Sequence, residues 1–165
     1  MTSTRPSDGP SPDVTVLAEE GSLRIIASRN VLVAAWRDAP TMSQLHALER
    51  VGRERGEQYP RGTALLNLAL SGKPDFSADV RKETARVSAL PDIFVLATAH
   101  IVLVRGLVGA AVRAFLSTSV LMARPTRPTK VFGDTLPAVD WVLARLAPAG
   151  EAWTRQGLVA VVDQG

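Results

Sequence analysis

The chain has 165 residues, of which 46% are hydrophobic and 21% are charged. This length and composition suit one folded domain with a single sizeable core. The formal net charge of +3 is too weak a bias to indicate a nucleic-acid binder, which usually shows a strong basic patch. Because cysteine is absent, disulfides, thiol chemistry and cysteine-ligated metals are excluded. The composition agrees with a cytoplasmic location.

The first residues, MTSTRPSDGPSP, are polar and rich in Pro, Ser and Thr. They contain no apolar stretch of the kind that a secretory signal needs. We therefore expect a disordered tail over residues 1–12. The folded domain is expected over 13–147, followed by a C-terminal extension over 148–165.

Two runs rich in β-branched residues, SLRIIAS and VLVAAWR, are separated only by Arg29 and Asn30. Such a pair between two strand-like runs predicts a hairpin, because Asn tolerates a positive φ. Thr41 then begins the pattern TMSQ, which is typical of a capping box with Gln44. The pattern predicts a helix that begins here and ends near Pro60.

The run GTALLNLAL predicts a strand over 63–70 that is buried on both faces. Ser77 is expected to cap the next helix, which stops at Pro91. Further along, KVF predicts a short strand, and Asp134 or Thr135 caps a final helix. The C-terminal extension contains LVAVV, which we interpret as an additional edge strand.

The most apolar stretch, 93–122, raises the question of a membrane span, which needs roughly 20 mostly apolar residues. Arg105 and Arg113 interrupt it, and one arginine at mid-membrane costs about 2.5–3.5 kcal/mol. We therefore expect no span. The unbroken run from Ile93 to Leu96 instead predicts a buried strand, followed by a helix. One apolar stripe of that helix is expected to face the core: Val104, Leu107, Val108, Ala111, Val112, Phe115 and Ser119.

Strands and helices alternate along the chain, which indicates an α/β domain with a mixed, largely parallel sheet and about four helices. Four segments resemble STAS-like (SpoIIAA-like) domains of the short bacterial single-domain type: AAWRDAPTMSQLHAL, ALLNLAL, RGLVGAAVRAFLSTSVLMARPTRPTKVF and DTLPAVDWVLARL. In the last segment, Ala138 and Trp141 match an Ala-x-x-Trp-Leu ending, with Val142 in place of the leucine. The resemblance covers about residues 22–147 and implies a layered β-α fold.

The resemblance also implies a non-catalytic regulatory or protein-interaction module. Related folds bind small apolar or lipid molecules, which is the alternative hypothesis. In anti-anti-sigma members, a serine at the start of the helix after the third strand is phosphorylated, and the corresponding residue by order is Ser77 or, second, Ser71. The Asp-Ser pair expected there is missing, because this chain reads SGKPDFSAD. The phosphorylation switch is therefore not carried over, and a helix cap is the simpler interpretation of Ser77.

No constellation typical of catalysis or of cofactor binding occurs in the sequence. His46 and His100 lack the spacing of metal ligands, and the phosphate-binding loop and the Gly-x-Ser-x-Gly elbow are missing. We therefore expect neither a metal nor a cofactor, and no enzymatic activity. His100 is expected where a strand passes into a helix, as a structural histidine or as a ligand contact at the end of the sheet.

Cations are concentrated in one part of the chain, because no acidic residue occurs from Ile93 to Gly133. This region contains Arg105, Arg113, Arg124, Arg127 and Lys130. They form either a solvated basic surface or a docking patch for an acidic protein or an anionic head group. The expected partners are another protein or a second copy of the chain, with a lipid or apolar ligand as the alternative.

Overall fold

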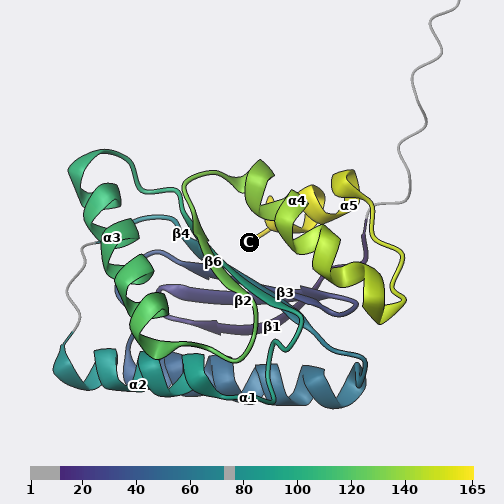
Figure 1. Cartoon of the computed structure of the whole chain (residues 1–165), viewed down its shortest axis with the longest axis horizontal. Coiled ribbons are helices and arrows are strands. Elements are labelled where there is room, and N and C mark those ends of the chain that lie inside the picture. Colours follow the sequence, from purple (N-terminus) through teal and green to yellow (C-terminus); the bar gives the residue numbers. More distant parts are fainter. Residues whose placement is uncertain (1–11, 73–76) are drawn as a thin grey trace, which may run out of the picture.

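The computed structural model describes residues 12–72 and 77–165, which form a central sheet covered by helices on both faces (Figure 1). The expected N-terminal tail lies outside the described residues except for Pro12. The sheet has six strands in the order of the chain, so each strand pairs with the next one. The strands are β1 (Thr15–Glu20), β2 (Leu23–Ser28), β3 (Val31–Trp36), β4 (Ala64–Ala69), β5 (Ala97–Val102) and β6 (Thr129–Phe132).

The first three strands pair antiparallel, and β3 to β6 pair parallel. The prediction of an α/β domain with a mixed, largely parallel sheet is therefore confirmed. The described residues contain five α-helices rather than four, and a 3₁₀ turn at Ala147–Ala149. The helices are α1 (Met42–Gln58), α2 (Ala78–Ala89), α3 (Gly106–Ala123), α4 (Thr135–Leu146) and α5 (Arg155–Val162).

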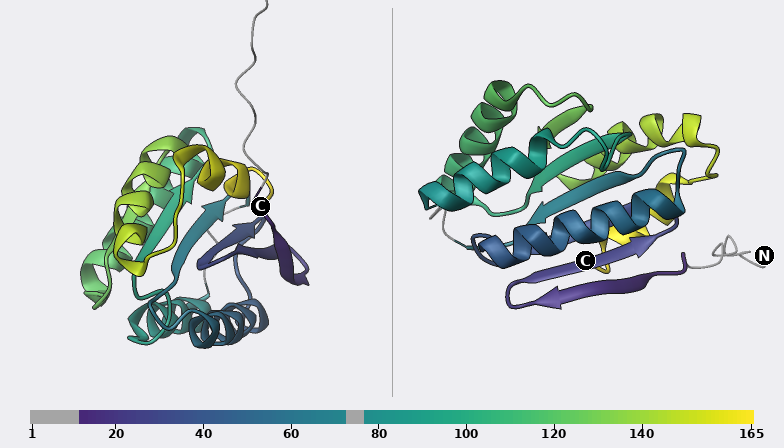
Figure 2. Two further views of the ribbon diagram at one scale, coloured as in Figure 1. Left: turned by 90° about the vertical axis from the view of Figure 1, so that its right-hand side faces the viewer. Right: turned by 90° about the horizontal axis from the view of Figure 1, so that it is seen from below.

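Two hydrophobic cores lie on the two faces of the sheet. The helices α1 and α2 cover one face, and α4 and α5 cover the other (Figures 1 and 2). Because successive strand residues point to opposite faces, Leu65 packs under α1 while Leu66 belongs to the core under α4 and α5. Helix α3 stands at the side of the molecule away from α4 and α5 (Figure 1).

The local signals at the hairpin and at α1 are confirmed. Strands β2 and β3 form the predicted hairpin, but the positive φ expected at Asn30 in its turn is found at Arg29, at 47°. Thr41 accepts a hydrogen bond from the backbone of Gln44, whose side chain accepts one from the backbone N–H of Thr41. These two bonds satisfy N–H groups that the helix itself leaves without partners.

Two terminal elements differ from the expectation. Strand β1 was not predicted, because it is an edge strand that is only partly buried and ends in Glu19 and Glu20. The LVAVV segment is not an edge strand; it forms part of α5, and Leu158 is fully buried in the core under α4. A short apolar run fits a buried helix as well as a strand, and here a capping threonine, Thr154, starts a helix.

The strand predicted from Ile93 to Leu96 is wrong in its position, since β5 begins only at Ala97. Ile93 and Phe94 are buried, but in a loop where Phe94 has a φ of 50°. The Phe94 ring lies against Gly52 of α1, where an added Cβ would lie 2.7 Å from the ring. Ile93 and Phe94 are therefore apolar because they pack beneath α1, and not because they pair in the sheet.

The core-facing stripe predicted for α3 is wrong in three of its seven members, Leu107, Val108 and Ala111, which are exposed. Leu107 is 91% exposed and Val108 is exposed, while Val112 is buried. The inner face of the helix contains Gly109, where an added Cβ would lie only 1.8 Å from the carbonyl oxygen of Val104. Helix α3 is apolar on nearly every side, so its periodicity did not identify the inner face.

Candidate functional site

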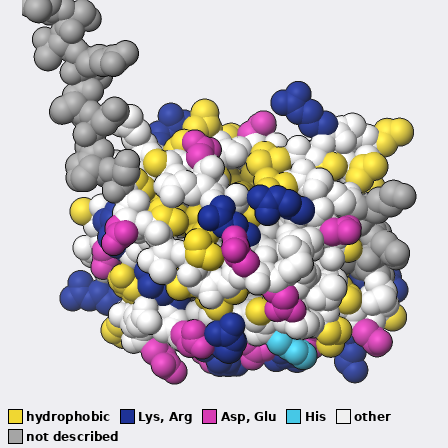
Figure 3. Space-filling view, turned by 180° about the vertical axis from the view of Figure 1, so that it is seen from behind, with side chains coloured by type: hydrophobic (Ala, Val, Ile, Leu, Met, Phe, Trp, Pro, Cys, Tyr) yellow, Lys and Arg dark blue, Asp and Glu magenta, His cyan; other side chains and the backbone are white. Residues whose placement is uncertain are grey.

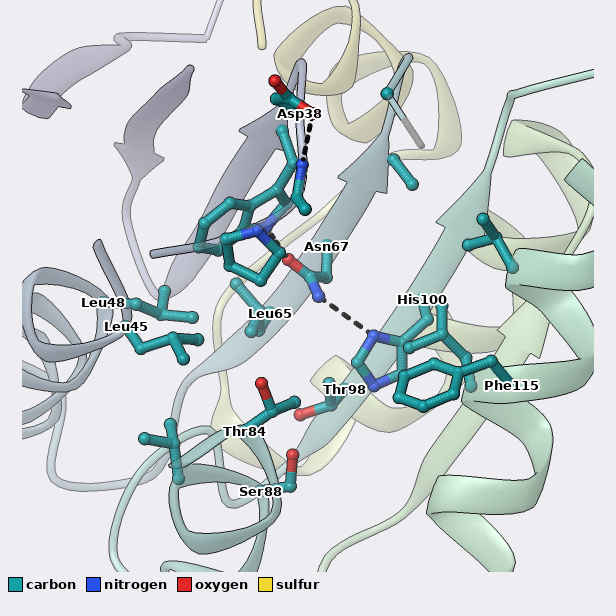
Figure 4. A pocket seen from close by; sticks show the side chains of 18 of the residues that line it. Asp38, Leu45, Leu48, Leu65, Asn67, Thr84, Ser88, Thr98, His100 and Phe115 are labelled. Carbon is teal, nitrogen blue, oxygen red and sulfur yellow. Dashed lines mark hydrogen bonds between the residues drawn. The ribbon is translucent and has the colours of Figure 1, made fainter. Parts of the chain in front are cut away.

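A chain of polar side chains crosses the face of the sheet that α1 and α2 cover. Asn67 of β4 is the register partner of His100 of β5; Asn67 interrupts an otherwise apolar strand, and His100 shares β5 with one other polar residue, Thr98. The indole Nε1–H of Trp36, at the end of β3, donates to Oδ1 of Asn67. The side-chain amide of Asn67 lies 3.0 Å from Nδ1 of His100. Figure 4 shows this Asn67–His100 contact at the centre of a pocket.

In this row of hydrogen-bonded side chains, Trp36 determines which groups donate and which accept. An indole can only donate, so the oxygen of Asn67 faces Trp36 and its amide group faces His100. Nδ1 of His100 is therefore the acceptor, and in the neutral ring the proton is on Nε2. The bond to Asn67 is the only hydrogen bond of the His100 ring within residues 12–72 and 77–165. The Nε2–H group is thus a donor held in a fixed orientation.

Burial keeps the ring of His100 neutral. The residue is 8% exposed, and burial, with a smaller effect of the nearby Arg127 charge, lowers the pKa of His100 to about 4. Removing a charged imidazolium from water is costly, and a neighbouring cation adds repulsion. His100 therefore stays uncharged at neutral pH. The expectation that it lies at a strand-to-helix junction is wrong, because it occupies the middle of β5.

Arg127 is buried rather than part of a surface patch, which corrects its place in the predicted docking patch. It is 8% exposed, and its Nε–H donates to the hydroxyl of Thr98 at 3.1 Å. Its Nη groups donate to the carbonyls of Val87 and Leu90 at the end of α2. Carbonyls at a helix C-terminus lack partners within the helix and carry partial negative charge. Arg127 thus connects α2 to β5, and burial lowers the pKa of its guanidinium.

Three hydroxyl groups lie beside His100. Thr84 and Ser88 come from α2, and Thr98 comes from β5; Figure 4 shows them on the same side of the pocket. The Thr84 hydroxyl is buried and has no hydrogen-bond partner among the described residues. Thr98 accepts from Arg127, which leaves its own proton free to be donated. The polar end of the pocket is therefore rich in donors and contains a hydroxyl that a ligand can satisfy.

The rest of the pocket is apolar. A cavity of about 110 Å³ lies between the sheet, α1, α2 and α3, and an adjoining cavity of about 320 Å³ continues between α2 and α3. Both are bordered by His100, Thr98, Phe115 and Leu116, so the two cavities lie side by side. The apolar walls include Leu45, Leu48, Leu65, Phe94, Val112 and Met122. Apolar walls with a few convergent polar groups are typical of a small-molecule site.

The other members of the predicted docking patch do not form part of this pocket. Arg105 and Arg124 are exposed at the two ends of α3, and Lys130 is exposed on β6. Arg113 is half-buried, with its side chain near Gly133. The structure thus separates the five cations into one buried structural arginine and four that lie in α3, at its two ends or in β6.

Ser77 caps α2 as expected, since its hydroxyl accepts from the backbone N–H of Val80 at 3.3 Å. His46 lies on α1, 3.2 Å from the carboxylate of Glu83, and does not line the pocket. Within the described ranges, no group of three or more His, Asp or Glu side chains is placed to hold a metal ion.

Sequence reasoning singled out His100 but missed its partners. Asn67 and Thr98 are polar residues inside buried strands, and that interruption is the signal that could have identified them. The sequence predicts that the strand begins at Ile93, whereas β5 begins at Ala97, so the prediction does not bring Asn67 and His100 together. Comparison with known proteins found no matching family model, curated protein or solved structure.

Proposed function

We propose that the protein is a non-catalytic binding module for a small amphipathic molecule with an apolar body and an oxygen-bearing end. The single observation that carries this proposal is the donor-rich polar end of an otherwise apolar cavity. The Nε2–H of His100 and the hydroxyl of Thr84 would donate to a carboxylate, carbonyl or hydroxyl oxygen of the ligand. The charge of Arg127 adds a positive potential that favours a carboxylate.

The tautomer of His100 argues against catalysis by the neighbouring hydroxyls. A histidine that activates a serine or threonine needs an unprotonated Nε2 facing the hydroxyl and an Nδ1–H that is held by an acceptor. In this protein the two ring nitrogens of His100 have the opposite roles, since Asn67 donates to Nδ1 and the proton is on Nε2. His100 therefore offers a proton to a ligand and cannot accept one from Ser88 or Thr84.

The order of strands and helices is compatible with the resemblance to STAS-like domains, and membership of that family is part of the proposal. The regulatory, protein-binding hypothesis has one observation in its favour. Leu107 and Leu121 of α3 are exposed apolar residues that line neither cavity. A protein partner would use that surface and would leave the cavity free.

The test is calorimetric titration with three probes that share one alkyl chain: decanoate, decanol and decylamine. The site supplies donors, so decanoate is expected to bind most tightly, decanol more weakly, and decylamine not measurably. Thr84→Val should weaken decanoate binding by about two- to tenfold, since one hydrogen bond is lost. Thr118→Val makes the same change on the exposed side of α3 and should have no effect. Failure of all three probes to bind, or equal binding of decylamine, would contradict the proposal.

A further inference from the structure

The outward side of α3 is an apolar surface that nothing in the described structure covers. Leu107 is 91% exposed, Leu121 is 77% exposed and Met122 is 78% exposed. Leu107 and Leu121 lie four turns apart on one side of the helix, separated by about 21 Å along its axis. The exposed positions between them are Val108 and the small residues Ala110, Ala111, Ala114, Ser117 and Thr118. Exposed apolar side chains gathered on one helix face mark an interaction surface more often than scattered ones do.

The charged residues of α3 and of the segments directly before and after it are all of one sign. Arg105 immediately precedes α3, Arg124 immediately follows it, and both are exposed. No acidic residue lies between Ile93 and Gly133. The face turned away from the view of Figure 1, in contrast, has basic and acidic side chains interspersed (Figure 3). An apolar helix face with cations at its margins is suited to the boundary between acyl chains and anionic head groups.

Helix α3 has the length and apolar composition of a helix that could cross a bilayer, and it is the one such helix in the described part of the chain. Its place in the fold argues against crossing. It connects β5 and β6, which pair with each other in the same sheet. A spanning α3 would pull both strands, and the half-buried Arg113, into the hydrocarbon. Helix α3 is therefore suited to lie along a membrane surface.

A second copy of the chain fits this surface less well. In a symmetric pairing of two α3 helices running antiparallel, Arg105 of one copy would approach Arg124 of the other. Like charges at an interface oppose association. The head groups of an anionic bilayer would attract Arg105 and Arg124, and its acyl chains would cover the same apolar residues.

We propose that the outer side of α3, defined by Leu107, Leu121 and Met122 with Arg105 and Arg124, docks the protein on the surface of an anionic bilayer. The inner side of the same helix lines the cavity through Val112, Phe115 and Leu116. Docking would thus bring one wall of the cavity to the lipid surface. The proposal goes beyond ligand binding and does not depend on it, because Leu107, Leu121, Arg105 and Arg124 line neither cavity, and only Met122 also borders the second one.

The experiment is flotation of the full chain with vesicles of phosphatidylcholine alone and of phosphatidylcholine mixed with phosphatidylglycerol. The protein should float with the mixed vesicles, and less so as salt is raised, because salt screens the attraction. Neutral vesicles should bind it more than tenfold less tightly. Binding to both kinds equally, or to neither, would overturn the proposal.

Two variants locate the surface. Leu107→Ser combined with Leu121→Ser and Met122→Ser should reduce binding to mixed vesicles by about tenfold or more, because the apolar contribution is lost. These side chains are exposed, so circular dichroism should show an unchanged fold. Leu136→Ser, which removes an exposed leucine from α4, is the matched control and should leave binding unchanged. Equal loss in the control would place the contact elsewhere.

Arg105→Glu with Arg124→Glu tests the charges and should also reduce binding by about tenfold or more. Arg37→Glu with Arg50→Glu changes the net charge equally at exposed positions on other elements, and should have a much smaller effect. Sedimentation velocity without vesicles tests the remaining alternative, in which a second copy of the chain covers this surface. A concentration-dependent dimer that the triple serine variant abolishes would replace the bilayer with a second copy of the chain.

Discussion

The neutral state of His100 makes a specific prediction about stability and pH. The pKa of His100 is lowered to about 4 in the folded chain, from a usual value of 6.5. Between these two values the unfolded chain binds a proton that the folded chain does not, so the free energy of unfolding falls as the pH falls. At pH 5 this linkage amounts to about 2 kcal/mol relative to neutral pH.

The perturbation that isolates the effect is His100→Gln. Glutamine offers Asn67 an acceptor and offers the cavity a donor, but it gains no proton in this range. Urea unfolding of the wild type should lose about 2 kcal/mol between pH 7 and pH 5, and the variant should lose much less. A His46→Gln variant is the control for the second histidine and should follow the wild type.

The carboxylates interfere little in this window. Hydrogen bonds from arginines, chiefly Arg86 to Glu49 and Glu83 and Arg155 to Asp140, lower the pKa values of these three side chains. A carboxylate whose pKa is lowered in the folded chain stabilises the fold until the pH falls below the usual pKa of that carboxylate. That loss occurs at a lower pH than the window from pH 7 to pH 5. Parallel losses in the wild type and in His100→Gln would refute the conclusion that burial keeps His100 neutral.

Four further substitutions test the packing. Thr84→Val should leave the midpoint of denaturation unchanged or raise it, because a buried hydroxyl without a partner is removed. A fall of more than about 1 kcal/mol in the free energy of unfolding would show that this hydroxyl is hydrogen-bonded in the free protein. Arg127→Met should destabilise the fold by about 2–4 kcal/mol, because the carbonyls at the end of α2 lose their donors, and an unchanged urea midpoint would contradict that role. Leu158→Ala should lower the free energy of unfolding by about 2–5 kcal/mol in the same assay. Leu107→Ser should lower it by less than about 0.5 kcal/mol. The reverse order would show that Leu158 is outside the core and that Leu107 is inside it.

The elements that were predicted well have strong local causes. The capping box at Thr41, the cap at Ser77 and the hairpin turn at Arg29 each depend on residues within a few positions of one another. The alternation of strands and helices follows from the same short-range patterns, which is why the α/β class could be predicted.

What the sequence could not supply depends on distant contacts. Arg127 is buried only because the end of α2, some forty residues earlier, presents its carbonyls there. Phe94 leaves the sheet because Gly52 in α1 provides a space for its ring. The inner side of α3 could not be identified because the helix is apolar all round, and only the fold decides which side meets the cavity.

The most direct test of the binding site is ¹⁵N NMR of the imidazole of His100, recorded with and without decanoate. The hydrogen bonds from Trp36 to Asn67 and from Asn67 to His100 predict a neutral ring that is protonated on Nε2 from pH 7 down to pH 5. Saturation with decanoate should shift the Nε2–H resonance, because the ligand oxygen becomes its acceptor. A ring protonated on Nδ1, or an Nε2–H resonance that is unchanged at saturation, would contradict the proposed site.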